Sequence, residues 1–384
     1  MQGRESVSQL LGGKRSLRSP MAAGPVGVYF GIERIDLVQS EYRGTERIIR
    51  TAASVPYPTD REQVIGSPVE LRKLVLEAFR SRPFRGRKVV TALPPNMVQL
   101  INMHYKCRRD QNNADALLKA IKGRFGDKLD DAVVDFLPIR PRVEDQVDRA
   151  ALVAIAQQDT VVGFLEALRK TGLSVKALEV GPVAIQRLLS NIQDVDDTSD
   201  KIMAFNIAEF KSFVTVVWDG DLLLDREIGI GLESIVAEVR DALDISADEV
   251  HQLLQTHGLQ YPEIQRAEQK VDSLDQDIGG TLIQILKPTF LKFADEIKKV
   301  LVYTASETQG GGIDNVYVLG GVSRWPGIDE YMTRLIGRPV KKLHPFFGFP
   351  VKDSSVRISQ LDSSSGMAVA TGLSLREVKS RAGT

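Results

Sequence analysis

The sequence contains very little cysteine or histidine. Its 384 residues include one cysteine, Cys107, and four histidines. A single cysteine excludes an intrachain disulfide and any metal site with several cysteine ligands. The four histidines lie at no spacing that is typical of metal ligands, so we expect no zinc or other metal centre.

Net charge and long apolar runs are also absent. Lys and Arg total 50, and so do Asp and Glu, which gives a formal net charge of zero. A balance of this kind implies no general attraction to nucleic acid or to anionic lipid. The chain has no run of 18 apolar residues, and its basic first 24 residues lack an apolar core of signal-peptide length. We therefore predict a cytoplasmic protein with a disordered basic tail at residues 1–24, no membrane span and no nucleic-acid partner.

The pattern of strands occurs in two similar halves. Three short strands joined by tight turns are predicted from Val26 to Val55, and a second set starts near Lys201 with a hairpin at Asp219–Gly220. An acidic, turn-like stretch at residues 193–200 separates the halves. The repeat has a period of about half the chain, which indicates a duplicated architecture.

Several residues mark predicted helix ends. Ser67 and Ser246 are each followed three residues later by a glutamate, so we expect a capping box at both positions. Asp159 or Thr160 is expected to cap a third helix. A last helix is predicted over Asp362–Glu377, where small residues would let it cross another backbone closely.

A strand followed by two glycines and a helix lies near the C-terminus. Val316–Leu319 is an apolar strand pattern, Gly320–Gly321 breaks it, and a helical pattern from Ile328 ends at Gly337. Paired glycines at such a junction allow positive φ angles and a close approach of the backbone to a ligand. This junction is one way in which proteins hold the adenosine end of a nucleotide.

Taken together, these features resemble the actin-like ATPase superfamily, and within it the PilM family of type IV pilus assembly proteins more than the FtsA family. The resemblance runs from Val26 to Leu375. Its most specific motifs are VVTALPP at 89–95, WDGDLLLDREIGIG at 218–231, the strand–glycine–helix stretch from Val316, and GMAVATGLSLR at 366–376. The resemblance implies an α/β fold of two actin-like lobes, a duplicated ribonuclease-H-like core, with a small α+β subdomain inserted in the first lobe.

The domain boundaries follow from the same resemblance. Residues 25–95, 174–200 and 362–384 are expected to form the first lobe, with the inserted subdomain at 96–173. The second lobe is expected at 201–361 and includes a helical insertion at 232–301.

The first phosphate loop of the superfamily carries an aspartate, an apolar residue and a glycine, followed by small hydroxylic residues. The matching positions are Tyr29, Phe30, Gly31, Ile32, Glu33, Arg34 and Asp36. Only the glycine is kept. Ile32 and Glu33 stand where backbone N–H groups face phosphate oxygens in the family, so this loop opposes an anion by shape and by charge.

The second phosphate loop is altered as well. The matching positions are Asn206, Ile207, Ala208, Glu209, Phe210 and Lys211. Asn206 lacks the carboxylate that organises Mg²⁺ and water in such sites, and Phe210 replaces a glycine that is needed for close backbone approach.

The turn on the adenosine side keeps the family pattern. The resemblance therefore implies a residual nucleotide cleft, made of Gly31, Lys211, Gly229, Gly231, Gly320, Gly321 and Ser323. With both phosphate loops altered, we expect a pseudo-ATPase with no catalytic residue and no bound cofactor. The alternative is a switch that binds ATP and Mg²⁺ through Arg34 and Lys211 as replacement phosphate ligands.

The resemblance also implies a role and partners. We expect a non-catalytic scaffold of a type IV pilus or related assembly machine, peripheral at the inner membrane through its partners. In the family, a groove between the first-lobe core and the inserted subdomain receives the N-terminal tail of the membrane-anchored protein PilN, and other surfaces contact assembly ATPases. Candidate partner-binding residues are Asn102, Met103, Tyr105 and Arg108. Self-association, including an FtsA-like filament, is an alternative, although Leu373–Val378 is too short for an amphipathic membrane helix.

Overall fold

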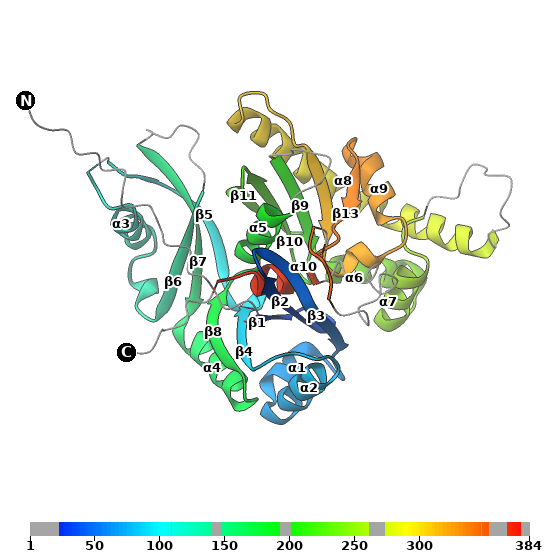
Figure 1. Ribbon diagram of the computed structural model, residues 1–384. Coiled ribbons are helices and arrows are strands. Elements are labelled where there is room, and N and C mark those ends of the chain that lie inside the picture. Colours follow the sequence, from blue (N-terminus) through cyan, green and yellow to red (C-terminus); the bar gives the residue numbers. More distant parts are fainter. Residues whose placement is uncertain are drawn as a thin grey trace, which may run out of the picture.

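The protein is described by a computed structural model (Figure 1). The described residues are 23–108, 110–139, 147–192, 201–260, 273–346, 348–352 and 367–377. The predicted tail, apart from residues 23 and 24, and the acidic stretch at 193–200 lie outside them. Within the described ranges, no helix combines the length and the apolar character that a membrane span requires.

Two sheets with the same topology form the two lobes. The first has the order β3-β2-β1-β4-β8, and the second has the order β11-β10-β9-β12-β13. In each, an antiparallel meander of three strands is followed by two strands parallel to its first strand. The bounds are β1 (Ala23–Phe30), β2 (Arg34–Arg43), β3 (Glu46–Pro56), β4 (Lys88–Ala92), β8 (Ser174–Glu179), β9 (Lys201–Ile207), β10 (Ser212–Trp218), β11 (Asp221–Ile228), β12 (Asn315–Leu319) and β13 (Val340–Lys342). The internal repeat predicted from the sequence is thereby confirmed.

Helices cover both sheets. The bounds are α1 (Arg61–Gly66), α2 (Pro68–Arg80), α4 (Gln158–Lys170), α5 (Gly181–Asn191), α6 (Leu232–Leu243), α7 (Ala247–Thr256), α8 (Ser273–Glu307), α9 (Ile328–Ile336) and α10 (Ala368–Ser374). The capping box at Ser246 is complete. Ser67 accepts a hydrogen bond from the backbone of Glu70, but the Glu70 carboxylate pairs with Lys73 instead of completing the box.

The predicted cap of α4 was wrong. The helix begins at Gln158, one residue before Asp159, and its N-cap residue Gln157 makes no side-chain capping bond. The backbone N–H of Gln158 is satisfied instead by the carbonyl of Asp131, at 2.8 Å. A tertiary contact therefore replaces the local cap, which is why the sequence pattern misplaced it.

The close helix crossing predicted near the C-terminus is confirmed over the described part, α10. A Cβ added to Gly372 would lie 1.9 Å from the Ala184 carbonyl oxygen of α5, and one added to Gly27 of β1 would lie 2.0 Å from the Ala370 oxygen. Helices α5 and α10 share one apolar cluster with residues of both sheets, including Val90 and Ala204. These two helices therefore hold the lobes together and fix the cleft between them.

A smaller sheet, of order β5-β7-β6, follows β4 in the chain. Its strands are β5 (Gln99–Lys106), β6 (Ala132–Ile139) and β7 (Asp148–Gln157), and α3 (Asn113–Phe125) packs on it. This subdomain also meets the second lobe, because the Asn102 amide donates to the Asp225 carbonyl and Leu222 packs against Ile139 and Leu152. It therefore lies against both lobes.

Candidate functional site

Two hairpin turns, one from each lobe, face each other across the cleft. In the first, between β1 and β2, the Gly31 N–H donates to the Arg34 carbonyl at 2.9 Å. In the second, between β9 and β10, the Ala208 N–H donates to the Lys211 carbonyl at 3.0 Å. Each turn is closed in the same way and at the same place in its sheet, so the two sequence stretches matched to phosphate loops are structural equivalents.

The first turn is attached to the opposite lobe by its side chains. Ile32 packs against the apolar core of the second lobe. The Glu33 carboxylate lies 3.6 Å from Nδ1 of His251 and accepts from the Gln255 amide at 3.5 Å, both on α7. The Tyr57 hydroxyl donates to the Gly31 carbonyl and fixes the turn from behind. The acidic residue of this turn thus stands at the rim of the cleft.

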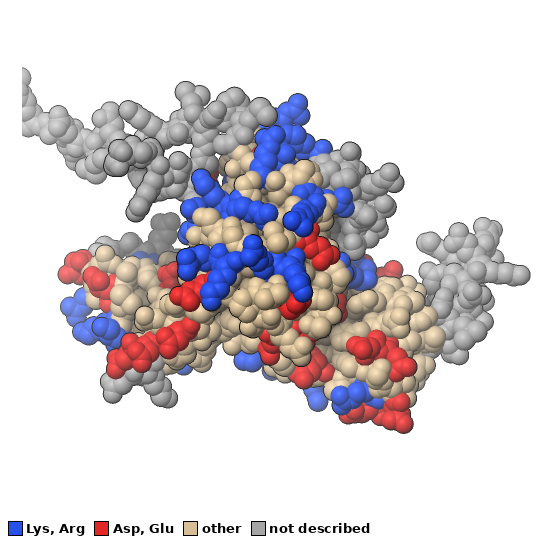
Figure 2. All heavy atoms as spheres, turned by 90° about the horizontal axis from the view of Figure 1, so that it is seen from below, with Lys and Arg blue, Asp and Glu red and all other residues tan. Residues whose placement is uncertain are grey.

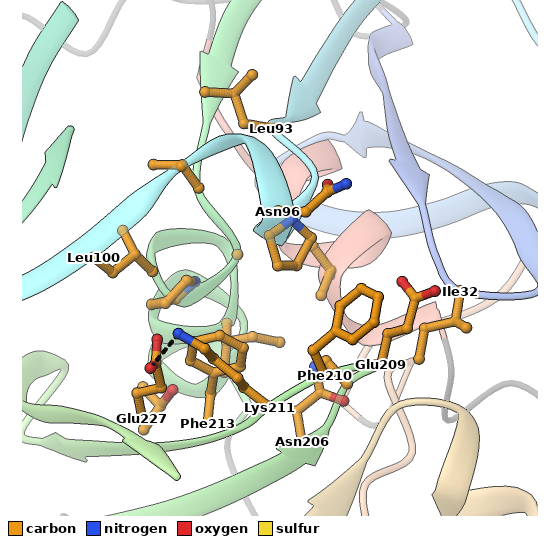
Figure 3. Close-up of a pocket in the computed structure, with 18 of the residues that line it drawn as sticks. Ile32, Leu93, Asn96, Leu100, Asn206, Glu209, Phe210, Lys211, Phe213 and Glu227 are labelled. Carbon is orange, nitrogen blue, oxygen red and sulfur yellow. Dashed lines mark hydrogen bonds and ion pairs between the residues drawn. The ribbon is translucent and has the colours of Figure 1, made fainter. Parts of the chain in front are cut away.

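The second turn is attached to the first lobe. The Glu209 carboxylate forms a 2.6 Å ion pair with Arg61, whose side chain is only 5% exposed at the start of α1. Burial raises the pKa of Glu209, and the Arg61 charge opposes that shift. Lys211 points the other way and forms a 2.6 Å ion pair with Glu227 of β11 (Figure 3). The cation predicted as a replacement phosphate ligand therefore already has a carboxylate partner.

The start of α6 is covered by the second turn. The backbone N–H groups of Leu232 and Glu233 donate to the carbonyls of Ala208 and Glu209, at 2.8 and 2.9 Å. A Cβ on Gly231 would lie 2.3 Å from the Phe210 backbone, so glycine is required for this contact. Helix N-termini attract phosphate through such free N–H groups, but here the protein's own carbonyls use them. Gly231 supports the turn and does not face the cleft, and Gly229 is exposed nearby.

The adenosine-side turn is formed as the sequence predicted. Gly320 has a φ of 84°, and a Cβ there would lie 2.1 Å from the Asn206 side-chain oxygen. Ser323 is buried and donates to the Gly320 carbonyl. Gly321 keeps an open face. The structure thus brings Gly31, Gly320 and Gly321 together with Asn206 around one hollow, which we call the narrow cleft.

The narrow cleft is small and contains charges of both signs. Its volume is about 50 Å³, whereas small-molecule sites typically have roughly 300–1,000 Å³. Asp36 is buried, which raises its pKa to about 6, while Ser54, Arg324 and Arg34 lower it. Arg34 donates to the Ser54 side chain at 2.8 Å and to its carbonyl at 3.1 Å. In this arrangement the Arg34 guanidinium is engaged within its own sheet.

On the subdomain side of the turns lies a larger hollow, the interlobe cavity, of about 290 Å³ (Figure 3). Phe210, with half of its surface exposed, reaches into it toward Asn96. Leu93, Leu100 and Phe213 contribute apolar walls. Phe210 therefore fills space between the lobes.

A third hollow, the apolar groove, lies between the first lobe and the subdomain and has a volume of about 350 Å³. One wall comes from α4, β8 and the start of α5, and the other comes from β6 and β7. The lining includes Val133, Phe136, Val161, Leu165 and Leu178, with Asp135, Glu179 and Arg376 as charged groups. Glu179 pairs with Arg187 at 2.8 Å and also with Arg376.

The predicted partner-binding residues lie elsewhere, and two of them cannot contact a partner. Met103 and Tyr105 are each 5% exposed and pack in the subdomain core beneath α3, where the Tyr105 hydroxyl donates to Asn113 at 2.6 Å. Asn102 bonds to the second lobe, and Arg108 is exposed beyond the end of β5. The face of β5 that carries Met103 and Tyr105 points into the subdomain core.

The sequence analysis missed the residues that line the apolar groove, because the sequence pattern that marks them is weak. Strand β6 carries apolar residues on both faces, with Val133 43% exposed and Phe136 half-buried. In a strand at the edge of a sheet, apolar residues on the outer face indicate a covered or binding surface. The sequence contained this pattern in AVVDFLPI, but did not reveal that β6 is the edge strand.

Known proteins with the same architecture were found among solved structures. The structure described as the PilM-PilN type IV pilus biogenesis complex is similar with a TM-score of 0.71 and 21% identity, over 93% of this chain and 99% of that chain. The ethanolamine utilization protein EutJ from Carboxydothermus hydrogenoformans is similar with a TM-score of 0.50 and 14% identity, over 93% and 90%. No curated protein matches the chain. The fold is the two-lobed actin-like α/β fold predicted from the sequence.

A family model provides the closer assignment. The model described as type IV pilus assembly protein PilM matches residues 27–378, which is nearly the whole chain. The protein therefore belongs to the PilM family of type IV pilus assembly proteins.

Proposed function

We propose that this PilM-family protein is a non-catalytic scaffold, cytoplasmic and held at the inner membrane, that binds the N-terminal tail of a PilN-like partner in the apolar groove. The observation that carries the proposal is the groove itself, of about 350 Å³ with mostly apolar walls. In the described part of the chain β6 pairs only with β7, so its other edge is available to an extended peptide. Such an edge supplies backbone hydrogen bonds, and adjacent pockets select side chains.

The solved relative that contains PilN supports the choice of partner. The charged end of the groove supports a polar contact as well, because Arg376 and Glu179 line it and belong to one ion-pair network with Arg187. A peptide with apolar side chains followed by a charged or amide group fits this order of surfaces.

Titration of the protein with a synthetic peptide of the PilN-like tail tests the groove. Val133→Glu and Leu165→Glu each place a carboxylate in the apolar wall and are expected to weaken peptide binding by at least about tenfold, since hot-spot contacts dominate such affinities. Leu118→Glu on α3 is the matched control, because Leu118 is 41% exposed, close to the 43% of Val133, and lies outside the groove. Equal binding by all three variants would remove the groove from the proposal.

The absence of catalysis is the second part of the proposal. It is supported by Glu33 and Glu209 at the two turns, by the amide of Asn206, and by carbonyls on the first N–H groups of α6. Lys211 and Arg34, which the ATP-switch alternative requires, are engaged with Glu227 and Ser54. Calorimetric titration with ATP and Mg²⁺ is expected to give no heat of binding. Micromolar binding that is lost in Arg34→Ala would establish the switch instead.

A further inference from the structure

Six basic residues gather at one edge of the first lobe. They lie where the parallel strands β4 and β8 begin and where α2 and α4 end, and we call them the basic edge: Arg80, Arg85, Arg87, Lys88, Arg169 and Lys170. The Ser174 N–H donates to the Arg87 carbonyl at 2.8 Å, which brings the segments before the two strands side by side. Seen from below, Lys and Arg concentrate over the middle of the molecule, where Figure 1 places α1, α2 and α4 (Figure 2).

The basic edge is exposed and its charges are not neutralised. Each of the six side chains is exposed, and within the described ranges none of them forms an ion pair. Three exposed carboxylates lie on the same helices, namely Glu77 on α2 and Asp159 and Glu166 on α4, with Asp159 at the end of α4 away from the edge. The zero net charge of the whole chain therefore conceals a local excess of positive charge, which attracts anions over a distance of about one Debye length, roughly 8–10 Å.

The backbone that carries these charges is fixed in place. The buried Gln39 side chain accepts from the Arg85 N–H and donates to the Arg85 and Gly24 carbonyls, each at 2.9 Å. The Arg87 guanidinium lies 4.3 Å above the Phe79 ring. Because the loop is already ordered, binding through it loses little conformational entropy.

We propose that the basic edge docks the protein directly on an anionic lipid surface. In the described part of the chain, none of the six lines the narrow cleft, the interlobe cavity or the apolar groove. Arg80 lines a hollow that is widely open to solvent, so the edge offers charge on an open surface and not an enclosed pocket. A peptide or a small ligand needs such shape for affinity, whereas mobile anionic headgroups respond to clustered Lys and Arg alone.

The basic edge lies close enough to the apolar groove for both to be used at one membrane surface, an argument that rests on the proposed function. Helix α4 contributes Leu165 to the groove and Arg169 to the edge, one helical turn later. Strand β4 separates Lys88 from Leu93 by five residues, or about 16 Å at the usual rise per residue. About six extended residues of a membrane-anchored partner cover this distance. One orientation thus places the groove within reach of the anchor and the edge on the lipid.

Flotation with vesicles tests the proposal on the full chain. The protein is expected to float with vesicles that contain phosphatidylglycerol, to stay behind with vesicles of phosphatidylcholine alone, and to be released as salt is raised. The triple variant Arg80→Glu, Arg85→Glu and Arg169→Glu is expected to reduce binding to the anionic vesicles by at least about tenfold. The matched control is Lys119→Glu, Lys122→Glu and Arg124→Glu on exposed positions of α3, which changes the net charge by the same amount.

If both variants lose vesicle binding equally, total charge governs binding and the assignment to the basic edge is overturned. The assignment is also overturned if both variants keep the vesicle binding of the parent protein. Binding to soluble polyglutamate without binding to vesicles would assign the edge to an acidic protein and overturn the lipid proposal. The PilN-like peptide separates the two proposals, because a failure of the basic edge leaves peptide binding to the edge variant intact. Loss of peptide binding with intact flotation would instead remove only the groove.

Discussion

The two turns at the cleft share one backbone design and differ in how they are held. Each is closed by a hydrogen bond from the first residue to the fourth, and each carries a glutamate at one of its two central positions. Glu209 reaches a nearly buried arginine at 2.6 Å, whereas Glu33 reaches a half-exposed histidine at 3.6 Å. Both carboxylates reach residues of the opposite lobe, so each turn is held to the other lobe through its own glutamate. The second turn is the more tightly built of the two.

The largest expected difference comes from the glycines that support the turns. In Gly231→Ala, the new Cβ would lie 2.3–2.5 Å from backbone atoms of Phe210 and Lys211, so the turn and α6 must move apart. We expect a loss of about 3 kcal/mol in the free energy of unfolding. Gly31→Ala meets one backbone oxygen at 3.0 Å and should cost about 1 kcal/mol.

Denaturant unfolding measures both values. Gly229→Ala is the control, because no atom lies within 4 Å of its added Cβ and the expected change is within about 0.5 kcal/mol. If Gly231→Ala and Gly31→Ala lower the free energy of unfolding by the same amount, the two turns are equally constrained, which contradicts the statement that the second turn is the more tightly built.

The next effect concerns the ion pair of the second turn. Arg61→Ala leaves the Glu209 carboxylate without its nearly buried partner, and we expect a loss of about 2 kcal/mol in the free energy of unfolding. Adding Glu209→Gln to this variant should recover part of the lost stability, because the uncharged amide leaves no partly buried charge without a partner. Arg72→Ala, an exposed arginine on α2, is the control. A double variant no more stable than Arg61→Ala would contradict the pairing.

Among the described residues, each lobe buries one aspartate whose carboxyl group has a raised pKa, and the shift is larger in the second lobe. Burial raises the pKa of Asp225 to about 7, and that of Asp36 to about 6, where arginines offset part of the shift. A carboxyl group whose pKa is higher in the folded than in the unfolded protein holds its proton in the folded state. The free energy of unfolding therefore falls as pH rises from about 4 to about 7, and then levels off.

Asp225→Asn removes the ionisable group and with it the fall in the free energy of unfolding above pH 4. The amide oxygen still accepts the hydrogen bond of the Thr215 hydroxyl, which donates to Asp225 at 2.7 Å. We expect the variant to be more stable than the parent by about 1–2 kcal/mol at pH 8 and equal to it near pH 4. Asp36→Asn should show the same sign with a smaller gain. Thermal unfolding across this pH range makes the comparison, and a gain at pH 4 as large as that at pH 8 would refute the titration argument.

The smallest effect is expected at the first turn. Glu33→Gln removes a partly exposed contact with His251, and such surface pairs contribute less than about 1 kcal/mol. We expect a change within about 0.5 kcal/mol in the same unfolding assay. A loss comparable to that of Arg61→Ala would show that both bridges hold the lobes equally.

The sequence predicted elements well where the determinants are local. The capping residues at Ser246, the hairpin at Asp219–Gly220, with φ angles of 52° and 81°, and the strand before Gly320 all depend on neighbouring residues. The start of α4 was misplaced because its first N–H is satisfied by a carbonyl 27 positions earlier in the chain, that of Asp131. Contacts of that kind leave no mark in a local pattern.

In the candidate site, too, the sequence predicted the locally determined features and missed those that depend on tertiary contacts. The glycines of the adenosine-side turn could be identified because positive φ and close approach restrict the residue type. The partners of Lys211, Glu33 and Glu209 could not, since each lies on a different element or in the other lobe. The resemblance implied a groove between the first lobe and the subdomain, and the structure has a hollow there. Its lining residues depend on which strands lie at the edges of the small sheet, and a local sequence pattern does not give that order.

The β6 edge has a consequence for how much of this protein a cell can hold without the partner proposed above. In the described part of the chain β6 has a partner strand on one side only, and an edge strand with an exposed Val133 lets a second copy add its own strand, which is a route to aggregation. Asp135 and Pro138 in the same strand are residue types that hinder such addition. These two residues hinder strand addition only in part. Chains that are made in excess of the proposed partner are therefore the ones that can aggregate through this edge. If the proposed tail covers this edge, balanced synthesis of the two proteins is a requirement that follows from a single strand.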